Sequence, residues 1–118
     1  IHNWMKSGQL RTVLAAIFEV LKPGGILGVV EHRETPGHIL DSRAVTGYVS
    51  ENYLTTMAEA AGFKFLASAD INANPKDHHN HPAGVWTLPP RLKLLEQDRE
   101  KYLSIGESDR MTITFIKP

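Results

Sequence analysis

The sequence has no cysteine among its 118 residues, which excludes disulfide bonds and thiolate metal sites. It has no excess of charge of either sign, because acidic and basic residues number 13 each. We therefore expect no nucleic-acid or membrane-surface partner. No apolar run approaches the length of a membrane span, and no signal peptide is visible. The sequence does not identify the cellular compartment. The cytoplasm is the default expectation, and export of a longer parent protein is also compatible with the sequence.

The sequence also lacks an initiator methionine and any run-in before its first expected helix. It begins Ile1-His2-Asn3-Trp4, which we interpret as part of a loop over residues 1–6 that leaves an upstream strand. We therefore expect a fragment: residues 1–118 form a single partial domain, long enough for one core.

What the sequence does contain is a long apolar stretch over residues 9–33. Apolar residues spaced three and four apart predict an amphipathic helix over about 8–22. Pro23 and Gly24 end this helix, and the pair suits the centre of a type II turn. The apolar run that follows predicts a strand over about 26–32, covered by helices on both faces as in an α/β sheet.

After this strand the sequence predicts a loop and a second helix. Residues 34–49 contain turn formers and no periodicity, so we expect a long loop over the carboxyl edge of the sheet, where a substrate lid would lie. Ser50 is expected to cap a helix that ends near Gly62.

The last part of the chain predicts two strands that flank an insertion. Residues 63–71 and 111–116 alternate in polarity, and the first of these strands should have one face better buried than the other. Because no helical crossover of the usual kind joins the two strands, we expect them to pair antiparallel. The insertion over 72–110 is expected to be irregular, apart from a helix within 91–105.

Several short motifs lie at the joints between these elements. L-K-P-G-G at 21–25 precedes the first strand, A-G-F at 61–63 precedes the second, and N-P-K-D at 74–77, S-D-R at 108–110 and F-I-K-P at 115–118 lie around the insertion. In this order they resemble the C-terminal half of class I S-adenosylmethionine-dependent methyltransferases. The motifs at 74–77, 108–110 and 115–118 are similar to those of a group of small bacterial predicted methyltransferases.

The resemblance implies an α/β fold, the C-terminal half of a Rossmann-like seven-stranded methyltransferase sheet with an antiparallel edge formed by its last two strands. It also implies a parent enzyme that transfers a methyl group from S-adenosylmethionine to a small-molecule acceptor. The family's glycine-rich cofactor loop and its acidic ribose-binding residue are both missing here. Gly24 and Gly25 cannot replace that loop, because they follow a helix and open a strand. The chain alone is therefore expected to bind S-adenosylmethionine poorly or not at all, and to be inactive.

The resemblance also assigns cofactor-binding residues at the start of the chain. His2, Asn3 and Trp4 would follow the family's fourth strand, where Asn3 could bond the cofactor and Trp4 could stack. The alternative is that Asn3 starts a turn and Trp4 belongs to the core.

Glu31, His32 and Arg33 follow the apolar strand, and ligands of open α/β sheets bind beyond the carboxyl ends of parallel strands. Glu31 or His32 is the candidate base for an acceptor proton, but not both, because successive strand residues point in opposite directions. Arg33 could hold an anionic substrate, and Tyr48 in the presumed lid could contact it. The alternatives are a strand that runs out into solvent and a tyrosine that packs in the core.

The histidines at 78, 79 and 81 suggest a metal site, but we expect none there. Neighbouring residues tend to diverge, no H-E-x-x-H spacing exists, and cysteine ligands are absent. We expect a solvated loop instead.

Two further hypotheses stand beside methyl transfer. An unpaired edge of the 26–32 strand would seek a partner, so the chain could be a non-catalytic piece that forms a homodimer or a strand-exchanged oligomer. The chain could also be half of a nicotinamide-dependent oxidoreductase, since related sheets serve many chemistries. The alternating last strand after a long insertion disfavours this third hypothesis.

Overall fold

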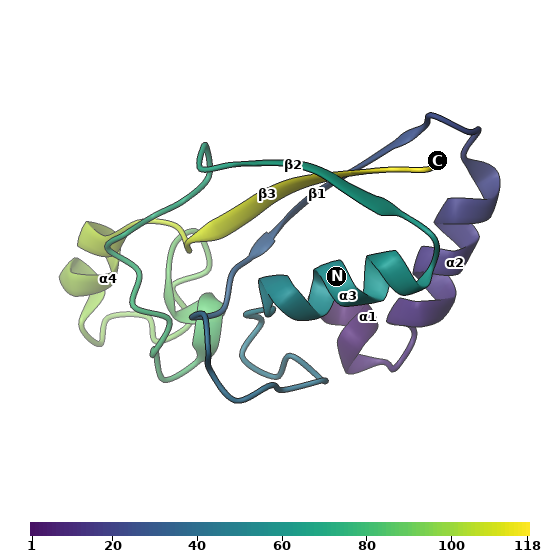
Figure 1. Ribbon diagram of the computed structural model, residues 1–118. Helices are drawn as coiled ribbons and strands as arrows, with labels where there is room; N and C mark the ends of the chain where they lie inside the picture. The colour runs from purple at the N-terminus through teal and green to yellow at the C-terminus, as the bar shows by residue number, and fades with distance from the viewer.

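The computed structural model describes residues 1–118 as a mixed α/β fold with a small three-stranded sheet (Figure 1). The helices are α1 (His2–Lys6), α2 (Leu10–Val20), α3 (Glu51–Ala60) and α4 (Arg99–Ile105), together with the 3-10 helix η1 (Gly84–Thr87). The strands are β1 (Ile26–His32), β2 (Lys64–Ala69) and β3 (Arg110–Ile116). None of these helices combines the length and the apolar character that crossing a membrane requires.

The two long predicted helices and all three predicted strands are confirmed, whereas the predictions for residues 1–6 and 91–105 need correction. Residues 1–6 are not a loop, because α1 occupies most of them and packs against α2 through buried Met5. The helix predicted within 91–105 is confirmed over Arg99–Ile105 only, since the backbone forms turns until Asp98. Leu92 and Leu95 there adopt positive φ angles of 45° and 58°, which a continuous helix does not allow.

The turn between α2 and β1 follows from its two glycines. Gly24 has a φ of +84°, as the second centre of a type II turn requires. A Cβ on Gly25 would lie 2.8 Å from the carbonyl oxygen of Lys22, so no larger residue fits there. Backbone hydrogen bonds of 2.7 and 2.9 Å then join this turn to Lys117, which ties the start of β1 to the end of the chain.

The last strand of the sequence lies in the middle of the sheet. The order is β1-β3-β2, and β3 pairs antiparallel with both neighbours. The antiparallel pairing expected for the last two strands is therefore confirmed. In β1, the register runs from Ile26 opposite Ile116 to His32 opposite Arg110. The other edge of β1 has no strand beside it, and a single bridge from Arg33 to Val49 covers only its carboxyl end.

Helices cover only one face of the sheet. Helices α1, α2 and α3 all lie below it in Figure 1, and they share with that face a core of buried apolar residues: Met5, Leu10, Leu14, Val29, Ala44, Val49, Leu54, Ala58, Phe63, Met111, Ile113 and Phe115. Ser50 begins α3 as predicted, since its Oγ accepts a hydrogen bond from the backbone N–H of Tyr53.

The expectation that β1 is buried on both faces was wrong. Val29 and Glu31 are buried on the helix side, but Ile26 and Val30 on the other face are 47% and 54% exposed. All of β2 is exposed, so the prediction that it has a better buried face was also wrong. For β1 the reason is that no helix of residues 1–118 covers the second face. Strand β2 lies at the edge of the sheet and is exposed on both of its faces.

The molecule is elongated. Its radius of gyration is 15.3 Å and its extents are 49 × 28 × 25 Å, whereas a compact domain of this length has a radius of about 13.5 Å. The long axis runs from the α2 end of the sheet to the region of α4 (Figure 1).

Candidate functional site

The polar cluster at the carboxyl end of β1 centres on Glu31, which is only 5% exposed. Its Oε1 accepts a hydrogen bond of 2.6 Å from the backbone N–H of His2 and lies 2.8 Å from Nδ1 of the His2 ring. Its Oε2 accepts a 2.9 Å hydrogen bond from the backbone N–H of His32. A carboxylate thus joins the start of α1 to the end of β1, although 29 residues separate the two in the sequence.

The ring of His32 is held by a residue near the end of the chain. Its Nδ1 lies 2.5 Å from the hydroxyl oxygen of Ser108, which leaves Nε2 without a protein partner. The rings of His2 and His32 are 5.3 Å apart between centroids, and the ring of Trp86 in η1 packs edge-on against His2 at 6.1 Å. These residues come from four separate segments, so the fold alone brings them together.

The pKa values of both candidate bases, Glu31 and His32, are lowered, and the carboxylate becomes the weaker base of the two. Burial alone would raise the pKa of Glu31, but the ring and backbone N–H groups of His2 stabilise the carboxylate and lower that pKa to about 2. Burial lowers the pKa of His32, and the negative charge of Glu31 opposes this only in part. At neutral pH the site therefore holds a charged, weakly basic carboxylate beside a neutral imidazole.

Arg33 is engaged inside the protein. Its Nε and Nη2 donate hydrogen bonds of 3.1 and 2.9 Å to the two carboxylate oxygens of Asp109, and its Nη1 lies 3.7 Å from Glu51. The hydrogen bonds to Asp109 raise the pKa of Arg33. This forked pairing favours a positioning role for the Arg33 side chain over direct capture of an anionic substrate.

Tyr48 lies in the core of the loop that precedes α3, and 3% of it is exposed. Its hydroxyl donates to Asp77, with distances of 2.9 and 2.7 Å to Oδ1 and Oδ2. Burial is the main reason that the pKa of Tyr48 is raised, and the hydrogen bond to the Asp77 carboxylate adds to it. The predicted loop over 34–49 contains no helix or strand apart from a single bridge at Val49, and the side chain of Tyr48 faces inward, toward Asp77.

Asp77 and Asp109 fasten the two ends of the insertion to each other. The backbone N–H of Asp109 donates to Asp77 Oδ2 at 2.9 Å, and that of Asn74 donates to Asp109 Oδ1 at 2.8 Å. The Nδ2 group of Asn74 also donates to the carbonyl oxygens of Ile105 and Glu107. The sequence motifs at 74–77 and 108–110 therefore meet in one hydrogen-bonded lock beside the end of β1.

The three residues expected to bind a cofactor diverge, because successive helical positions differ by about 100°. His2 contacts Glu31, Asn3 is exposed, and Trp4 is half-buried against the apolar core. His2 is thus the one member of this set that joins the polar cluster.

The rings of His78, His79 and His81 have different neighbours, but the expected solvated loop was wrong for His81, whose side chain is 5% exposed. His79 lies between Thr35 and Asp109, His81 contacts Asp77, and His78 is exposed. The group of potential metal ligands in the structure is a different one, namely His2, Glu31 and His32.

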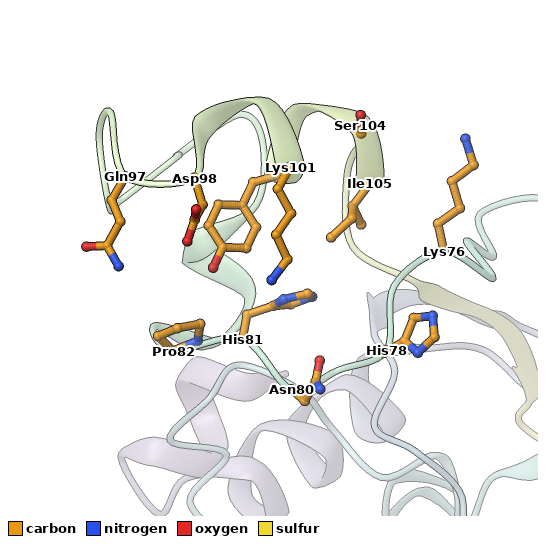
Figure 2. Close-up of a pocket in the computed structure, with 11 residues that line it drawn as sticks. Lys76, His78, Asn80, His81, Pro82, Gln97, Asp98, Lys101, Ser104 and Ile105 are labelled. Atoms are coloured by element: carbon orange, nitrogen blue, oxygen red, sulfur yellow. The ribbon is translucent and has the colours of Figure 1, made fainter.

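Two cavities lie near the insertion. A small one of about 210 Å³ is lined by His32, Trp86, Ser108 and Arg110, and the buried Nε of Arg110 has no hydrogen-bond partner. The largest cavity, about 720 Å³, lies between residues 76–82 and α4 (Figure 2). None of the site residues predicted from the sequence lines the larger cavity, so the small one is the cavity that belongs to the cluster.

Sequence reasoning missed three residues of this site: Trp86, Ser108 and Arg110. The S-D-R motif was the available signal for two of them, since it marked residues 108–110 without giving them a role. Nothing in the sequence pointed to Trp86, because its contact with His2 depends on where the insertion folds back.

No protein-family model and no curated protein matches this chain. Among solved structures, the [4+2]-cyclase SpnF is similar in fold, with a TM-score of 0.53 and 23% sequence identity. The match covers 92% of this chain and 44% of SpnF, so the chain spans less than half of the length of that protein. At this level of identity the likeness concerns the fold alone.

Proposed function

We propose that residues 1–118 are the C-terminal portion of an S-adenosylmethionine-dependent methyltransferase, the C-terminal half of its Rossmann-like seven-stranded sheet, and that the cluster at the end of β1 faces a small-molecule methyl acceptor. The observation that carries this proposal is the sheet itself. Strands β2 and β3 form an antiparallel edge, while the far edge of β1 is open where a seven-stranded sheet would continue. The ordered motifs and the likeness to SpnF support the same proposal.

His32 is the better candidate for the base within this proposal. Methyl transfer is an in-line displacement, so most of the catalysis comes from holding the acceptor and the methyl carbon aligned. Where the acceptor must lose a proton, a neutral imidazole accepts it more readily than a carboxylate with a pKa of about 2. In the tautomer in which Nδ1–H donates to Ser108 Oγ, the His32 ring would present a lone pair on Nε2. Glu31 then serves to position His2 and the end of β1.

Residues 1–118 do not complete a cofactor pocket. A glycine-rich cradle must follow a strand and open a helix, whereas Gly24 and Gly25 lie in the turn that leads from α2 into β1. S-adenosylmethionine would supply the methyl group in the longer protein. The residues of this chain would supply the acceptor side of the site.

The experiment is calorimetry with S-adenosylmethionine on two proteins, the 118-residue chain and the longer protein that includes the upstream sequence. We expect no measurable binding to the chain and binding to the longer protein. A longer protein that binds a nicotinamide cofactor and not S-adenosylmethionine would overturn the proposal. Binding of S-adenosylmethionine to the chain alone would contradict the argument that its cradle lies elsewhere.

A second candidate is a non-catalytic role through self-association. It is favoured by the open edge of β1 and by the uncovered face, defined by Ile26, Val30, Thr112, Thr114 and Ile116. An open strand edge with apolar side chains beside it is a template for another strand. The occupant we propose for the isolated chain is a second copy, in a homodimer or a strand-exchanged oligomer.

A further inference from the structure

The strongest unassigned feature of the molecule is the ligand set formed by His2, Glu31 and His32. One ligand atom from each of the three residues lies within 4.8 Å of those from the other two. Two imidazoles and one carboxylate are the donors that Zn²⁺, Co²⁺ and Fe²⁺ accept in sites with an open coordination position. We propose that these three side chains bind one divalent transition-metal ion at the carboxyl end of β1.

The distances suit a site that closes around an ion. Zn–N bonds of about 2.0–2.1 Å in a tetrahedral site place neighbouring ligand atoms about 3.3 Å apart. His2 Nδ1 and Glu31 Oε1 are 2.8 Å apart, and all three ligand atoms lie within 4.8 Å of one another. Binding of one ion by all three side chains would require the two half-buried histidine rings to adjust their positions.

The surroundings of the cluster resemble a built metal site in two respects. Ligating histidines usually have their second ring nitrogen held by a hydrogen bond, and here Ser108 holds Nδ1 of His32 and directs Nε2 away from it. The carboxylate is 5% exposed, and its backbone donors, His2 and His32, fix its orientation. Trp86 packs against the His2 ring and limits its movement.

Three protein ligands leave one position of a tetrahedral ion for water or for an acceptor oxygen. This inference goes beyond the proposed function and does not depend on it, because the chain holds all three ligands whether or not a parent protein transfers methyl groups. A metal ion bound to His32 Nε2 would occupy the lone pair that accepts a proton. His32 could therefore act as a metal ligand or as a base, but not as both at once.

The test is titration of the untagged 118-residue chain with Co²⁺, followed by visible absorption, and with Zn²⁺, followed by calorimetry. We expect one ion per chain, a cobalt spectrum that Zn²⁺ abolishes, and no binding of Mg²⁺, which prefers an all-oxygen shell. His32→Ala and Glu31→Gln should each lower the affinity at least tenfold. Ser108→Ala, which leaves every ligand in place, should lower it about tenfold.

His78→Ala is the matched control, because His78 is exposed and lies outside the cluster. Its affinity should equal that of the unaltered chain. Absence of binding at millimolar Co²⁺ and Zn²⁺ would overturn the proposal, and so would an affinity unchanged by His32→Ala. The amine of Ile1 lies 3.2 Å from Glu31 Oε1, and chelation by that amine and His2 alone would give this second result. Circular dichroism checks that each variant folds, and if His32→Ala does not, unchanged affinity in Ser108→Ala overturns the proposal.

Discussion

The hydroxyl oxygen of Tyr48 lies 2.7 Å from Oδ2 of Asp77, and both side chains are buried. Asp77 also accepts from the backbone N–H groups of His79 and Asp109 and contacts the ring of His81. One carboxylate thus joins the loop before α3, the insertion and the start of β3. The position of the polar cluster at the end of β1 depends on this junction.

The first prediction concerns Tyr48→Phe. The change removes the hydroxyl from a buried carboxylate, and a hydrogen bond to a charged group contributes about 1.5–3 kcal/mol. We expect the free energy of unfolding in urea to fall by about that amount. Tyr53→Phe is the control, because the hydroxyl of half-buried Tyr53 makes no hydrogen bond in the structure. Equal stability of the two variants would show that the Asp77 junction contributes little.

The second prediction concerns acid. Burial alone would raise the pKa of Asp77, but its backbone and side-chain hydrogen bonds outweigh this and lower it, and the same holds for Asp109. An unfolded aspartate titrates near pH 3.9, so the folded protein binds fewer protons than the unfolded chain just below pH 5. The stabilisation is therefore complete above about pH 5 and is lost as the pH falls through the lower folded-state values.

Urea unfolding between pH 7 and pH 3 measures this loss, with Asp77→Asn as the comparison. We expect the variant to be less stable at pH 7 and to depend less on pH below pH 5, since it has one titrating group fewer. A free energy of unfolding that stays constant from pH 5 to pH 3, or an equal slope in the variant, contradicts the prediction.

The third prediction separates two roles of Arg33. If its forked pairing with Asp109 positions the insertion, Arg33→Lys should lower the free energy of unfolding by about 1–2 kcal/mol, because lysine cannot make both hydrogen bonds. The exposed Arg11, changed to lysine, is the control and should have little effect. Unaltered stability in Arg33→Lys would leave the guanidinium free for an anionic substrate, as the sequence suggested.

The fourth prediction concerns the uncovered face. Light scattering should find the isolated chain as a dimer or a larger oligomer at micromolar concentrations, because the β1 edge and its apolar neighbours are open. Val30→Lys places a charge on this face and should shift the chain to monomer. Ile39→Lys is the control, since Ile39 is 87% exposed in the loop and away from the sheet. A strictly monomeric unaltered chain would contradict the prediction.

Local signals were sufficient for most of the elements. The spacing of apolar residues located α2, the serine cap located α3, and the proline and glycine at 23 and 24 located the turn before β1. The bounds of β1 were predicted at 26–32, and those are its bounds in the structure. Each of these features depends on neighbours within a few residues, which a sequence displays directly.

Burial and the site needed information that no local pattern carries. The apolar run of β1 is typical of a strand that is covered on both faces, but which faces are covered depends on which other segments are present. The contact of Glu31 with His2 spans 29 residues, and that of His32 with Ser108 spans 76. The sequence therefore identified Glu31 and His32 as polar residues at a strand end, but not the partners that set their chemistry.

The lock between residues 74–77 and 108–110 separates the design of the insertion from that of the sheet. The hydrogen bonds of Asp77 and Asp109 hold the two ends of the insertion together. They therefore offset the entropy cost of closing this loop. Residues between these ends can then diverge, shorten or lengthen without disturbing the strand register. Proteins with this fold could therefore vary the part of the insertion that lies near the end of β1, and with it the molecules that bind there, while the sheet stays the same.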